Sequence, residues 1–335
     1  MEYRLLGKSG LKISRLGFGG IPIQKIDAAG TKKLMQNLMA QGINFLDTAR
    51  AYTVSESYLG EALEGIREHF VIATKSGSRD KVSMARDIDI SLSNLRTDYI
   101  DLYQVHNPSP ADLDTVIAPG GALEALLEAK AAGKIGHLGV TAHSAEVFER
   151  ALELPWVETI MFPYNIVETQ GEDLMKRCTE KNIGFICMKP LAGGALEDVE
   201  LALRFIAKNQ DVTVIIPGMA EEKEIQQNIA AVCNDAPLSA DELAAIENIR
   251  SSLGTQFCRR CNYCQPCAAG ISIYTVFLLE GYLSRYGLSD WAHQRYAGLD
   301  KKADDCIGCG VCESRCPYNL PIRDMMKAAA EKFKK

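Results

Sequence analysis

The sequence lacks the features that would point to a membrane, a nucleic acid or a secretory route. No apolar run reaches ten residues, so no segment is long enough to cross a bilayer as a helix. Basic residues are not in excess, because the formal net charge is −6 and the pI is near 5.5, and this balance argues against a nucleic-acid partner. The first ten residues contain no apolar signal core. We therefore expect a cytoplasmic protein with neither a membrane nor a nucleic-acid partner, whose thiols do not form structural disulfides.

Cysteine, by contrast, is abundant and clustered. Eight of the eleven cysteines fall within 59 residues, in two runs: Cys258-x2-Cys261-x2-Cys264-x2-Cys267 and Cys306-x2-Cys309-x2-Cys312-x3-Cys316-Pro317. The second run has the spacing of a bacterial [4Fe–4S] motif. Zinc sites also use Cys-x2-Cys pairs, but they normally need two pairs separated by a longer loop. The spacing therefore predicts two [4Fe–4S] clusters rather than zinc.

The first 235 residues alternate between short apolar runs and amphipathic helical stretches. Eight strand candidates recur at intervals of 24 to 35 residues, and they begin near Leu16, Ile43, Phe70, Ile100, Ile135, Thr159, Ile183 and Val212. Eight such βα units predict a parallel (β/α)8 TIM barrel. An open, doubly wound sheet is the alternative, but that fold usually carries G-x-G-x-x-G after its first strand, and this chain has only Gly17-x-Gly19-Gly20.

The rest of the chain reads as helical. A helix over 236–256 has Ser239 as its N-cap, with Glu242 three residues later. Helical spacing of apolar residues continues between the cysteine runs, and a last helix covers 322–335. These patterns predict a barrel domain over 1–256 and a small, mainly α-helical domain with two clusters over 257–335.

Three neighbouring strands of the predicted barrel end in ionisable residues. The second strand ends at Asp47, the third at Lys75 and the fourth at His106, and Tyr52 follows Asp47 by five residues. The C-terminal ends of barrel strands form the active-site face. Either catalysis or a structural buried ion pair would explain such a group, and the combination favours catalysis.

Four segments resemble the signatures of the aldo-keto reductase superfamily: Gly17-Phe18-Gly19, Asp47-Thr48-Ala49-Arg50-Ala51-Tyr52, Ala73-Thr74-Lys75 and Leu102-Tyr103-Gln104-Val105-His106. The resemblance covers about residues 1–235. The cysteine-rich tail resembles the helical, ferredoxin-like dicluster modules attached to a branch of that superfamily.

This resemblance implies a role for each of the four strand-end residues. Tyr52 would be the general acid that protonates a carbonyl oxygen. A free tyrosine has a pKa near 10, and a nearby Lys75 ammonium would lower it. Asp47 would hold Lys75, and His106 would orient the carbonyl or stabilise charge on its oxygen. A reduced nicotinamide, NAD(H) or NADP(H), would supply the hydride to a small carbonyl substrate.

The resemblance also implies a nicotinamide-binding set, although the match is weaker there. The loops after the seventh and eighth strands would receive the phosphates, and the full set is Gly20, Thr141, Leu191, Gly193, Gly194, Pro217, Gly218, Glu224, Gln227 and Asn228. Four departures concern family positions that contact the cofactor, and here they are Thr141-Ala142, Met161, Met188 and the pair Gly218 and Glu224. A carboxylate at the last position repels a 2′-phosphate, which favours NADH over NADPH.

In two-cluster ferredoxins the fourth cysteine of each run binds the other cluster. The resemblance therefore implies one ligand set of Cys258, Cys261 and Cys264 with Cys316, and a second of Cys306, Cys309 and Cys312 with Cys267. The first run departs from the usual form, since its last gap is x2 and Ala268 stands where proline is usual. The crossing is therefore less firmly implied for Cys267.

Three functional hypotheses remain open at this point. The first is a nicotinamide-dependent reductase, or alcohol dehydrogenase in reverse, whose clusters relay electrons to or from a redox partner protein. The second is an iron–sulfur electron-transfer or redox-sensing protein whose barrel has little reductase turnover. The third gives the clusters a purely structural role. Hydride transfer moves two electrons and each cluster takes one, and the sequence shows no flavin motif that would connect the two.

Overall fold

The structure is a computed structural model that describes residues 1–254 and 256–334. By its contacts the chain divides into two compact units. The first consists of Met1–Asn165, Thr169–Leu191 and Asp198–Pro237, and the second of Ile166–Glu168, Ala192–Glu197 and Leu238–Lys335. The predicted domain boundary after residue 256 stays a prediction. Among the described residues no helix combines the length and the apolar character needed to cross a bilayer.

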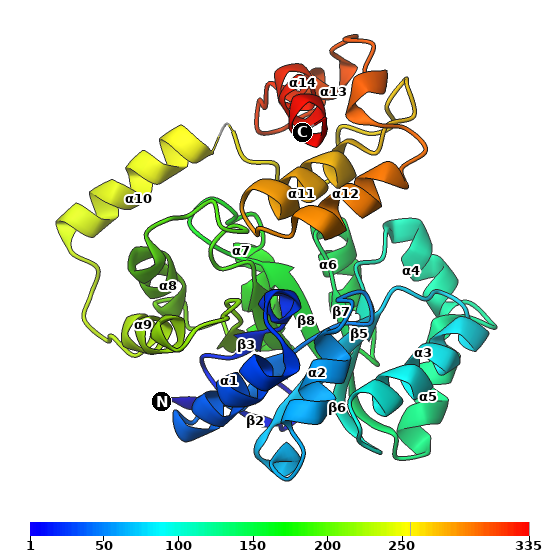
Figure 1. Cartoon of the computed structure of the whole chain (residues 1–335), viewed down its shortest axis with the longest axis vertical. Helices are drawn as coiled ribbons and strands as arrows, with labels where there is room; N and C mark the ends of the chain where they lie inside the picture. Colours follow the sequence, from blue (N-terminus) through cyan, green and yellow to red (C-terminus); the bar gives the residue numbers. More distant parts are fainter. Residues whose placement is uncertain (255, 335) are drawn as a thin grey trace. The chain divides into compact units, whose positions relative to one another are not determined.

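The first unit contains a closed barrel of eight parallel strands (Figure 1). In chain order the strands are β3 (Phe18–Gly19), β4 (Phe45–Asp47), β5 (Val71–Ser76), β6 (Ile100–His106), β7 (Ile135–Thr141), β8 (Thr159–Pro163), β9 (Gly184–Met188) and β10 (Val214–Ile215). Each strand pairs with the next, and parallel bridges from Leu16 to Ile215 and from Gly19 to Gly218 join β3 to β10. The predicted (β/α)8 barrel is confirmed.

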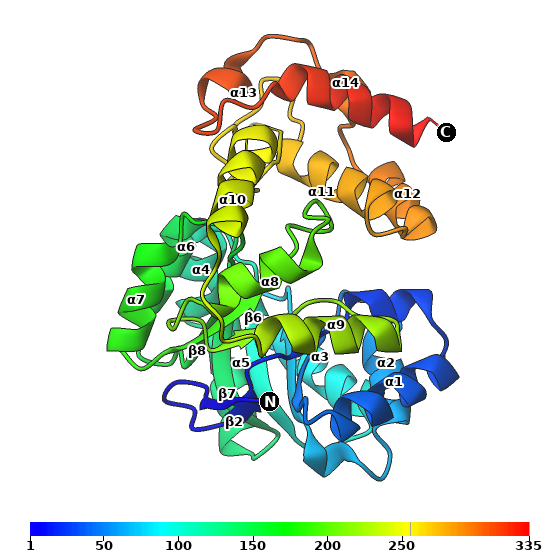
Figure 2. The same ribbon diagram turned by 90° about the vertical axis from the view of Figure 1, so that its left-hand side faces the viewer.

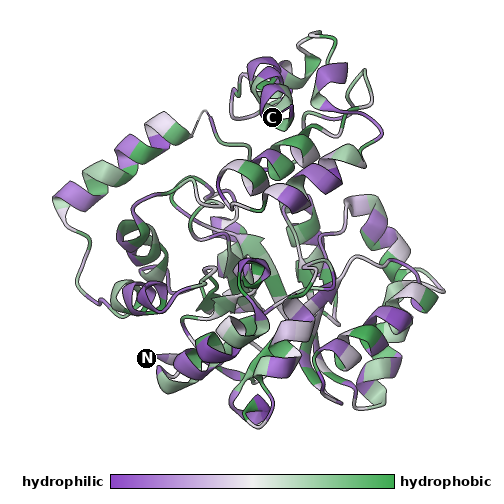
Figure 3. Ribbon diagram, viewed as in Figure 1, coloured by the Kyte–Doolittle hydropathy of each residue, from purple (hydrophilic) through white to green (hydrophobic). Residues whose placement is uncertain are grey.

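Helices follow the strands around the barrel: α1 (Ala28–Ala40), α2 (Ser55–Ala62), α3 (Lys81–Asn94), α4 (Pro110–Ile117), α5 (Ala122–Ala131), α6 (Ala145–Leu152), α7 (Glu172–Glu180), α8 (Val199–Ala207) and α9 (Glu222–Val232), with short 3-10 turns at Ile21–Lys25 and Arg67–His69. In Figure 3 the central strands are mainly green, whereas the helices mix green with purple. Their apolar sides pack on the outside of the strands, as an amphipathic helix requires.

The two faces of the sheet pack in two different hydrophobic clusters. Strand residues such as Leu46, Ile72 and Tyr103 belong to the large cluster between strands and helices. Their neighbours Phe45 and Ala73 belong to a smaller cluster inside the barrel. Side chains alternate along a strand, so residues two positions beyond an inner one also face the interior. This alternation positions the candidate site.

An antiparallel hairpin precedes the barrel. It pairs β1 (Tyr3–Leu5) with β2 (Lys12–Ser14). Leu6, which follows β1, and Ile13, the middle residue of β2, are fully buried in the cluster inside the barrel. Leu6 also lies against Gly184, the first residue of β9, so the hairpin fills the barrel interior near the end where the strands begin.

The second unit is helical. Its elements are α10 (Ala240–Leu253), α11 (Ile273–Ser284), α12 (Ser289–Ala297), a 3-10 turn at Ala303–Asp305, α13 (Val311–Ser314) and α14 (Ile322–Phe333). Ser239 and Glu242 form the predicted capping box of α10. Helix α11 packs against α12 and α14 (Figure 2). The rings of Tyr296 and Phe333 stack with centroids 3.8 Å apart, which joins the ends of α12 and α14 around a small apolar core.

Candidate active site and cluster sites

Asp47 and Lys75 form a buried ion pair inside the barrel mouth, the end where the parallel strands finish. They lie two residues beyond the inward-facing Phe45 and Ala73, so both side chains project into the interior. The Lys75 Nζ donates to Asp47 Oδ1 at 2.8 Å, to Oδ2 at 2.6 Å and to the Thr48 carbonyl at 2.8 Å. All three ammonium hydrogens therefore have acceptors.

Burial perturbs both members of this pair. It raises the pKa of Asp47, and the charge of Lys75 acts in the opposite direction. Burial likewise lowers the pKa of Lys75, and the Asp47 carboxylate counteracts that effect. Each charge therefore depends on the other, as expected for a pair withdrawn from water.

Tyr52 lies on the turn that joins β4 to α2. The turn is fixed by backbone hydrogen bonds: Arg50 N donates to the Lys75 carbonyl at 3.0 Å, and Ser55 N donates to the Tyr52 carbonyl at 2.8 Å. The Lys75 Nζ lies 5.0 Å from the centroid of the Tyr52 ring. The half-buried phenol is thus held beside the ammonium group.

His106 completes the group from the end of β6. Its ring stands edge-on to the ring of Tyr52, with centroids 6.2 Å apart and planes at 88°. Arg79 donates to the carbonyls of His106 and Asn107 at 3.0 and 3.1 Å, which fixes the backbone there. The structure therefore brings together the four residues that the sequence singled out, while their catalytic roles stay predictions.

A buried carboxylate beneath the Tyr52 turn was not anticipated from the sequence. Glu56, 1% exposed, accepts hydrogen bonds from Thr74 at 2.8 Å and Ser91 at 2.7 Å, and it pairs with Arg50 at 2.8 Å. These contacts tie α2 to β5 and α3. The sequence signal is weak, because a glutamate in the first turn of a helix normally reads as a solvent-facing residue.

The predicted cofactor glycines lie close to other backbone atoms. Gly20 N donates to the Asp47 carbonyl at 2.7 Å, and a Cβ at Gly20 would lie 2.7 Å from that same oxygen. A Cβ at Gly218 would lie 2.6 Å from Pro22 Cγ. Both positions therefore require glycine for packing, whether or not a ligand approaches them. Leu191 and Pro217 lie on the adjoining loops, Gln227 is exposed and Asn228 is buried.

Glu224 has a local role that was not anticipated from the sequence. Its Oε2 accepts from Ala220 N at 2.6 Å and from Glu221 N at 2.9 Å, which makes it the carboxylate of a capping box at the start of α9. The negative charge still lies at this helix N-terminus, but both hydrogen bonds go to the chain itself. The pattern Glu221-x2-Glu224 was an available signal.

Thr141 and His143 occupy the end of β7. The Thr141 hydroxyl accepts from Asn107 N at 2.9 Å, and Asn107 Oδ1 lies 3.0 Å from His143 Nδ1. Thr141 pairs with His106 in the sheet, and its hydroxyl therefore lies beside Asn107, the residue that follows His106. His143 was missed, although a histidine two residues after a barrel strand is a recognisable signal.

The predicted phosphate loop after β9 adopts an unusual backbone. Ala192, Gly193 and Gly194 have successive φ angles of 48°, 67° and 80°, a left-handed conformation that glycine adopts without strain. Arg285 Nε, at the end of α11, donates to the Gly193 carbonyl at 3.1 Å. Both residues belong to the second compact unit. Nothing in the sequence pattern indicated that Arg285 would contact this loop.

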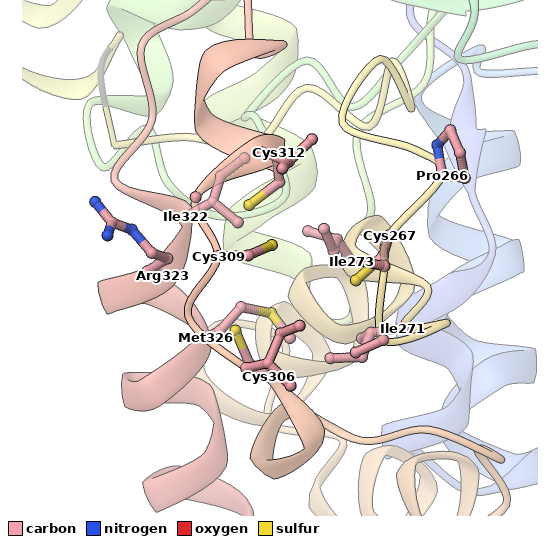
Figure 4. Close-up of a pocket in the computed structure, with 15 residues that line it drawn as sticks. Pro266, Cys267, Ile271, Ile273, Cys306, Cys309, Cys312, Ile322, Arg323 and Met326 are labelled. Atoms are coloured by element: carbon pink, nitrogen blue, oxygen red, sulfur yellow. The ribbon is translucent and has the colours of Figure 1, made fainter.

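Four cysteines line one cavity in the second unit (Figure 4). We name this group site B, and it consists of Cys267, Cys306, Cys309 and Cys312. The remaining walls are apolar, and they include Ile271, Ile273, Ile322 and Met326. Thiols in an apolar enclosure are the donor set that a [4Fe–4S] cluster takes. Cys267 shares this cavity with the second run, as the implied crossing requires.

The other four cysteines also influence one another. We name this group site A, and it consists of Cys258, Cys261, Cys264 and Cys316. Burial raises the pKa of the Cys258 thiol, and Cys261 and Cys316 raise it further. Burial raises the pKa of Cys264 to about 12, with Cys258 and Cys261 acting in the same direction. Cys316 also acts on the Cys261 thiol, but Cys312 of site B acts on Cys264 too, so the assignment of Cys316 to site A stays a prediction.

Two arginines flank the first thiols of site A. Arg260 pairs with the fully buried Glu168 at 2.8 Å, and Arg259 donates to the Val167 carbonyl at 2.9 Å. The guanidinium of Arg259 also lies 3.9 Å from the centroid of the Tyr318 ring. The segment Cys258–Cys261 is thereby fixed to residues 166–168 of the same unit.

Among the described residues, no three His, Cys, Asp or Glu side chains were found in an arrangement that would hold a single metal ion.

Comparison with known families accounts for both parts of the chain. The model of the Aldo/keto reductase family matches residues 15–200 and 197–251, and that of a 4Fe-4S dicluster domain matches residues 257–321. The first match includes the four residues of the barrel mouth. The second includes all eight clustered cysteines, from Cys258 to Cys316.

Individual relatives match about two thirds to three quarters of the chain. The chain is 27% identical over 307 residues to L-galactose dehydrogenase of Arabidopsis thaliana, which covers 74% of this chain and 94% of the relative. It is 32% identical over 249 residues to 6-dehydroglucose reductase of Novosphingobium aromaticivorans, with 68% and 80% covered. Among solved structures, the holo form of aldo-keto reductase AKR11C1 from Bacillus halodurans superposes with a TM-score of 0.64 at 27% identity, and 74% and 96% of the two chains are covered.

Proposed function

The chain belongs to the aldo-keto reductase family and carries a 4Fe-4S dicluster domain, and on this premise we propose that it is a nicotinamide-dependent carbonyl reductase, or an alcohol dehydrogenase in reverse. The observation that carries the proposal is the convergence of a phenol, an ammonium, a carboxylate and an imidazole in the barrel mouth. Lys75 binds Asp47 through both carboxylate oxygens, and it lies 5.0 Å from the ring centroid of Tyr52.

In this mechanism each residue acts on a proton or a charge. The chemistry that a reduced nicotinamide would supply, when bound here, is a hydride for the carbonyl carbon. Tyr52 donates its hydroxyl proton to the carbonyl oxygen, so that the product is an alcohol and the phenol becomes a phenolate. The Lys75 ammonium stabilises that phenolate, Asp47 keeps the ammonium in place, and the His106 ring donates a hydrogen bond to the carbonyl oxygen. Alcohol oxidation reverses each proton transfer.

We propose that the cofactor lies across the barrel mouth and that NADH serves at least as well as NADPH. Gly20, Gly218 and Thr141 adjoin the mouth, and Glu224 puts a negative charge at the start of α9. A carboxylate there disfavours a 2′-phosphate by charge repulsion, even though its hydrogen bonds go to its own helix. The contributions of Leu191, Gly193, Gly194, Pro217, Gln227 and Asn228 stay predictions.

We propose that the substrate is a small carbonyl compound, and sugars are the first candidates to assay. Two relatives carry names that refer to sugars, L-galactose dehydrogenase and 6-dehydroglucose reductase. A hydroxylated substrate would place further donors and acceptors against the polar residues of the mouth. Aldoses and keto-sugars therefore form the first group of a substrate panel.

A second candidate function is the exchange of single electrons with a redox partner protein through site B. The observation that favours it is the exposure of the loop between Cys306 and Cys312. Cys309 is exposed, Ile307 is 68% exposed and Val311 is 40% exposed. A cluster held by these four cysteines would accept and release one electron at a time. Apolar side chains at the surface beside such a group provide a contact area for a partner.

The proposal is tested by an anaerobic assay of the panel with NADH and with NADPH. Tyr52→Phe should lower carbonyl reduction about 10²- to 10⁴-fold, the usual contribution of a general acid, while NADH binding measured by fluorescence titration persists. Tyr58→Phe is the matched control, because Tyr58 lies on α2 and packs against the core, and it should leave turnover unchanged. Retention of most activity by Tyr52→Phe would remove Tyr52 from the role.

The same preparations separate the hypotheses for the clusters. Absorbance of the iron–sulfur chromophore is followed during turnover with NADH. Cluster reduction on addition of the alcohol substrate with NAD⁺, or reoxidation of prereduced clusters on addition of the carbonyl substrate, supports a relay to the barrel, because alcohol oxidation releases two electrons and carbonyl reduction consumes two. Reduction by a chemical donor alone, with no turnover of the panel, supports the electron-transfer protein. Clusters that stay unchanged in both experiments support a structural role.

A further inference from the structure

A row of residues with three polar side chains crosses the barrel interior, and it starts at Lys75 of the ion pair. Strand pairing sets Lys75 opposite Gln104, Gln104 opposite Gly139, Gly139 opposite Thr159 and Thr159 opposite Gly184. Gln104 and Thr159 each lie two residues from a member of the interior cluster, Leu102 and Met161 respectively, so both face inward. Barrel strands are tilted by about 36°, which carries the row from the mouth at Lys75 toward the other end at Thr159.

Two members of this row are buried without hydrogen-bond partners of ordinary geometry. Gln104 and Thr159 are both 0% exposed. Among the residues that the structure describes, neither the amide nitrogen nor the amide oxygen of Gln104, nor the hydroxyl of Thr159, has a partner. Leaving three such atoms unpaired in an interior is strongly unfavourable. The sheet position that separates the two residues is occupied by glycine.

The missing side chain at Gly139 brings the two polar residues to one place. A Cβ there would lie 2.2 Å from Thr159 Oγ1 and 3.2 Å from Gln104 Cγ. Thr159 Oγ1 is therefore within about 5.4 Å of Gln104 Cγ. A larger residue at 139 would collide with both. The glycine lets two polar side chains from non-adjacent strands approach each other inside an otherwise apolar barrel.

Gln104 also acts on the ion pair above it. Burial raises the pKa of Asp47, and Lys75 and then Gln104 lower it. The amide of Gln104 is thus directed toward the Asp47 carboxylate, although it forms no hydrogen bond of ordinary length and angle with it. Whatever orients the amide therefore affects how firmly Asp47 keeps its charge.

We propose that an internal water molecule bridges Gln104 and Thr159 beside Gly139, and that Gln104 is a positioning residue which keeps Asp47 ionised. Buried waters typically make two to four hydrogen bonds to polar groups that would otherwise be unpaired. Thr159 and one end of the Gln104 amide supply two. The water fixes the amide with its N–H groups toward Asp47. The water bridge rests on the packing alone, and the positioning role rests on the proposed reductase function.

The first test measures the thermal stability of the full-length, cluster-loaded protein by calorimetry. If the water bridges the pair, Thr159→Val and Gln104→Met should each lower Tm by about 2–6 °C. The double variant should lose clearly less than the two losses together, because one bridge is broken in all three proteins. Thr213→Val is the control partner for Gln104→Met. The Thr213 hydroxyl accepts from Phe185 N at 3.2 Å, so this pair should be additive.

The direction of the change in Tm for Thr159→Val decides the outcome. A hydroxyl that is truly unpaired is better replaced by a methyl group, so an unchanged or higher Tm for Thr159→Val would overturn the bridge. Additive losses in the Gln104→Met and Thr159→Val pair would overturn it as well. Neither result depends on catalysis, so they stand even if no substrate of the panel is turned over.

The second test concerns the positioning role. Gln104→Met should move the acidic limb of the pH profile for kcat upward by about one pH unit, since Asp47 would become protonated at higher pH and release Lys75. Thr159→Val should move it in the same direction by less. The KM for NADH should not change. An acidic limb that stays in place, with the Tm coupling present, would leave the bridge and overturn the positioning role.

Discussion

Replacing Lys75 with methionine should destabilise the barrel strongly and in a pH-dependent way. Methionine is close to lysine in length and lacks the charge, so packing changes little. The variant leaves the Asp47 carboxylate, 3% exposed, without its cation. It removes two hydrogen bonds to that carboxylate, of 2.8 and 2.6 Å, and a hydrogen bond to a charged group contributes about 1.5–3 kcal/mol. We therefore expect a decrease of about 3–5 kcal/mol in the free energy of unfolding at pH 7.5, the range found for broken buried pairs.

The pH dependence follows from the direction of the Asp47 pKa. Burial raises the pKa of Asp47, and Lys75 is the main influence that lowers it, so the pKa rises further in the variant. A group with a raised pKa in the folded state stabilises the protein below its unfolded pKa, about 3.9 for aspartate. That stability is lost as the pH rises through the folded pKa. The deficit of Lys75→Met should therefore be largest above pH 7 and should shrink as the pH falls toward 5.

Urea unfolding of the full-length protein, followed by tryptophan fluorescence from pH 5 to 8, measures the effect. Asp47→Asn combined with Lys75→Met should recover most of the missing stability, because no charge remains buried. Lys81→Met is the surface control: Lys81 pairs with Glu128 and Glu124 in a partly exposed position, and its removal should change stability by less than about 1 kcal/mol. An equal deficit for Lys75→Met at pH 5.5 and pH 7.5 would refute the reasoning.

Three further predictions concern the cofactors. Glu224→Arg should shift the ratio of kcat/KM toward NADPH, since a cation pairs with a 2′-phosphate. Glu224→Gln keeps an acceptor for the capping box and should shift this ratio less. An unchanged ratio in both variants would show that residue 224 does not influence the choice of cofactor. Protein purified without oxygen should contain about eight irons and eight sulfides per chain, and stoichiometric zinc would contradict the electron-carrying hypotheses. Cys316→Ala should abolish the paramagnetic resonance signal of site A and leave that of site B, whereas Cys267→Ala should do the reverse; damage confined to the run that contains the mutation would mean that each run closes its own site.

The barrel was predictable from the sequence because its strands are buried on both faces. Such strands are short apolar runs bounded by turn residues, and each of the eight observed strands begins within two residues of its predicted start. The hairpin of β1 and β2 was not anticipated. Its strands are three residues long and carry Arg4 and Lys12, so neither length nor alternation distinguishes them from a loop.

The mouth was predictable for a topological reason, and its surroundings were not. Residues at the ends of consecutive parallel strands must come together, so Asp47, Lys75 and His106 could be grouped from their places along the chain. The hydrogen bonds of Glu224 to its own helix and the contact of Arg285 with Gly193 depend on side-chain directions and on packing between distant segments. Spacing along the chain carries no information about those.

The part of the barrel that runs from β9 through β10 and β3 to β4 is held by fewer strand pairings than the rest. Strands β6 and β7 pair over six residue positions, whereas β3 meets β10 through two isolated bridges, at Leu16 and at Gly19, and the neighbouring pairs β3–β4 and β9–β10 cover two positions each. Opening begins where the fewest hydrogen bonds must break. Amide protons near Gly218 should therefore exchange with solvent faster than those in the middle of β6. A dinucleotide bound against Gly20 and Gly218 would contact the chain beside both β3 and β10, and it would therefore slow that exchange.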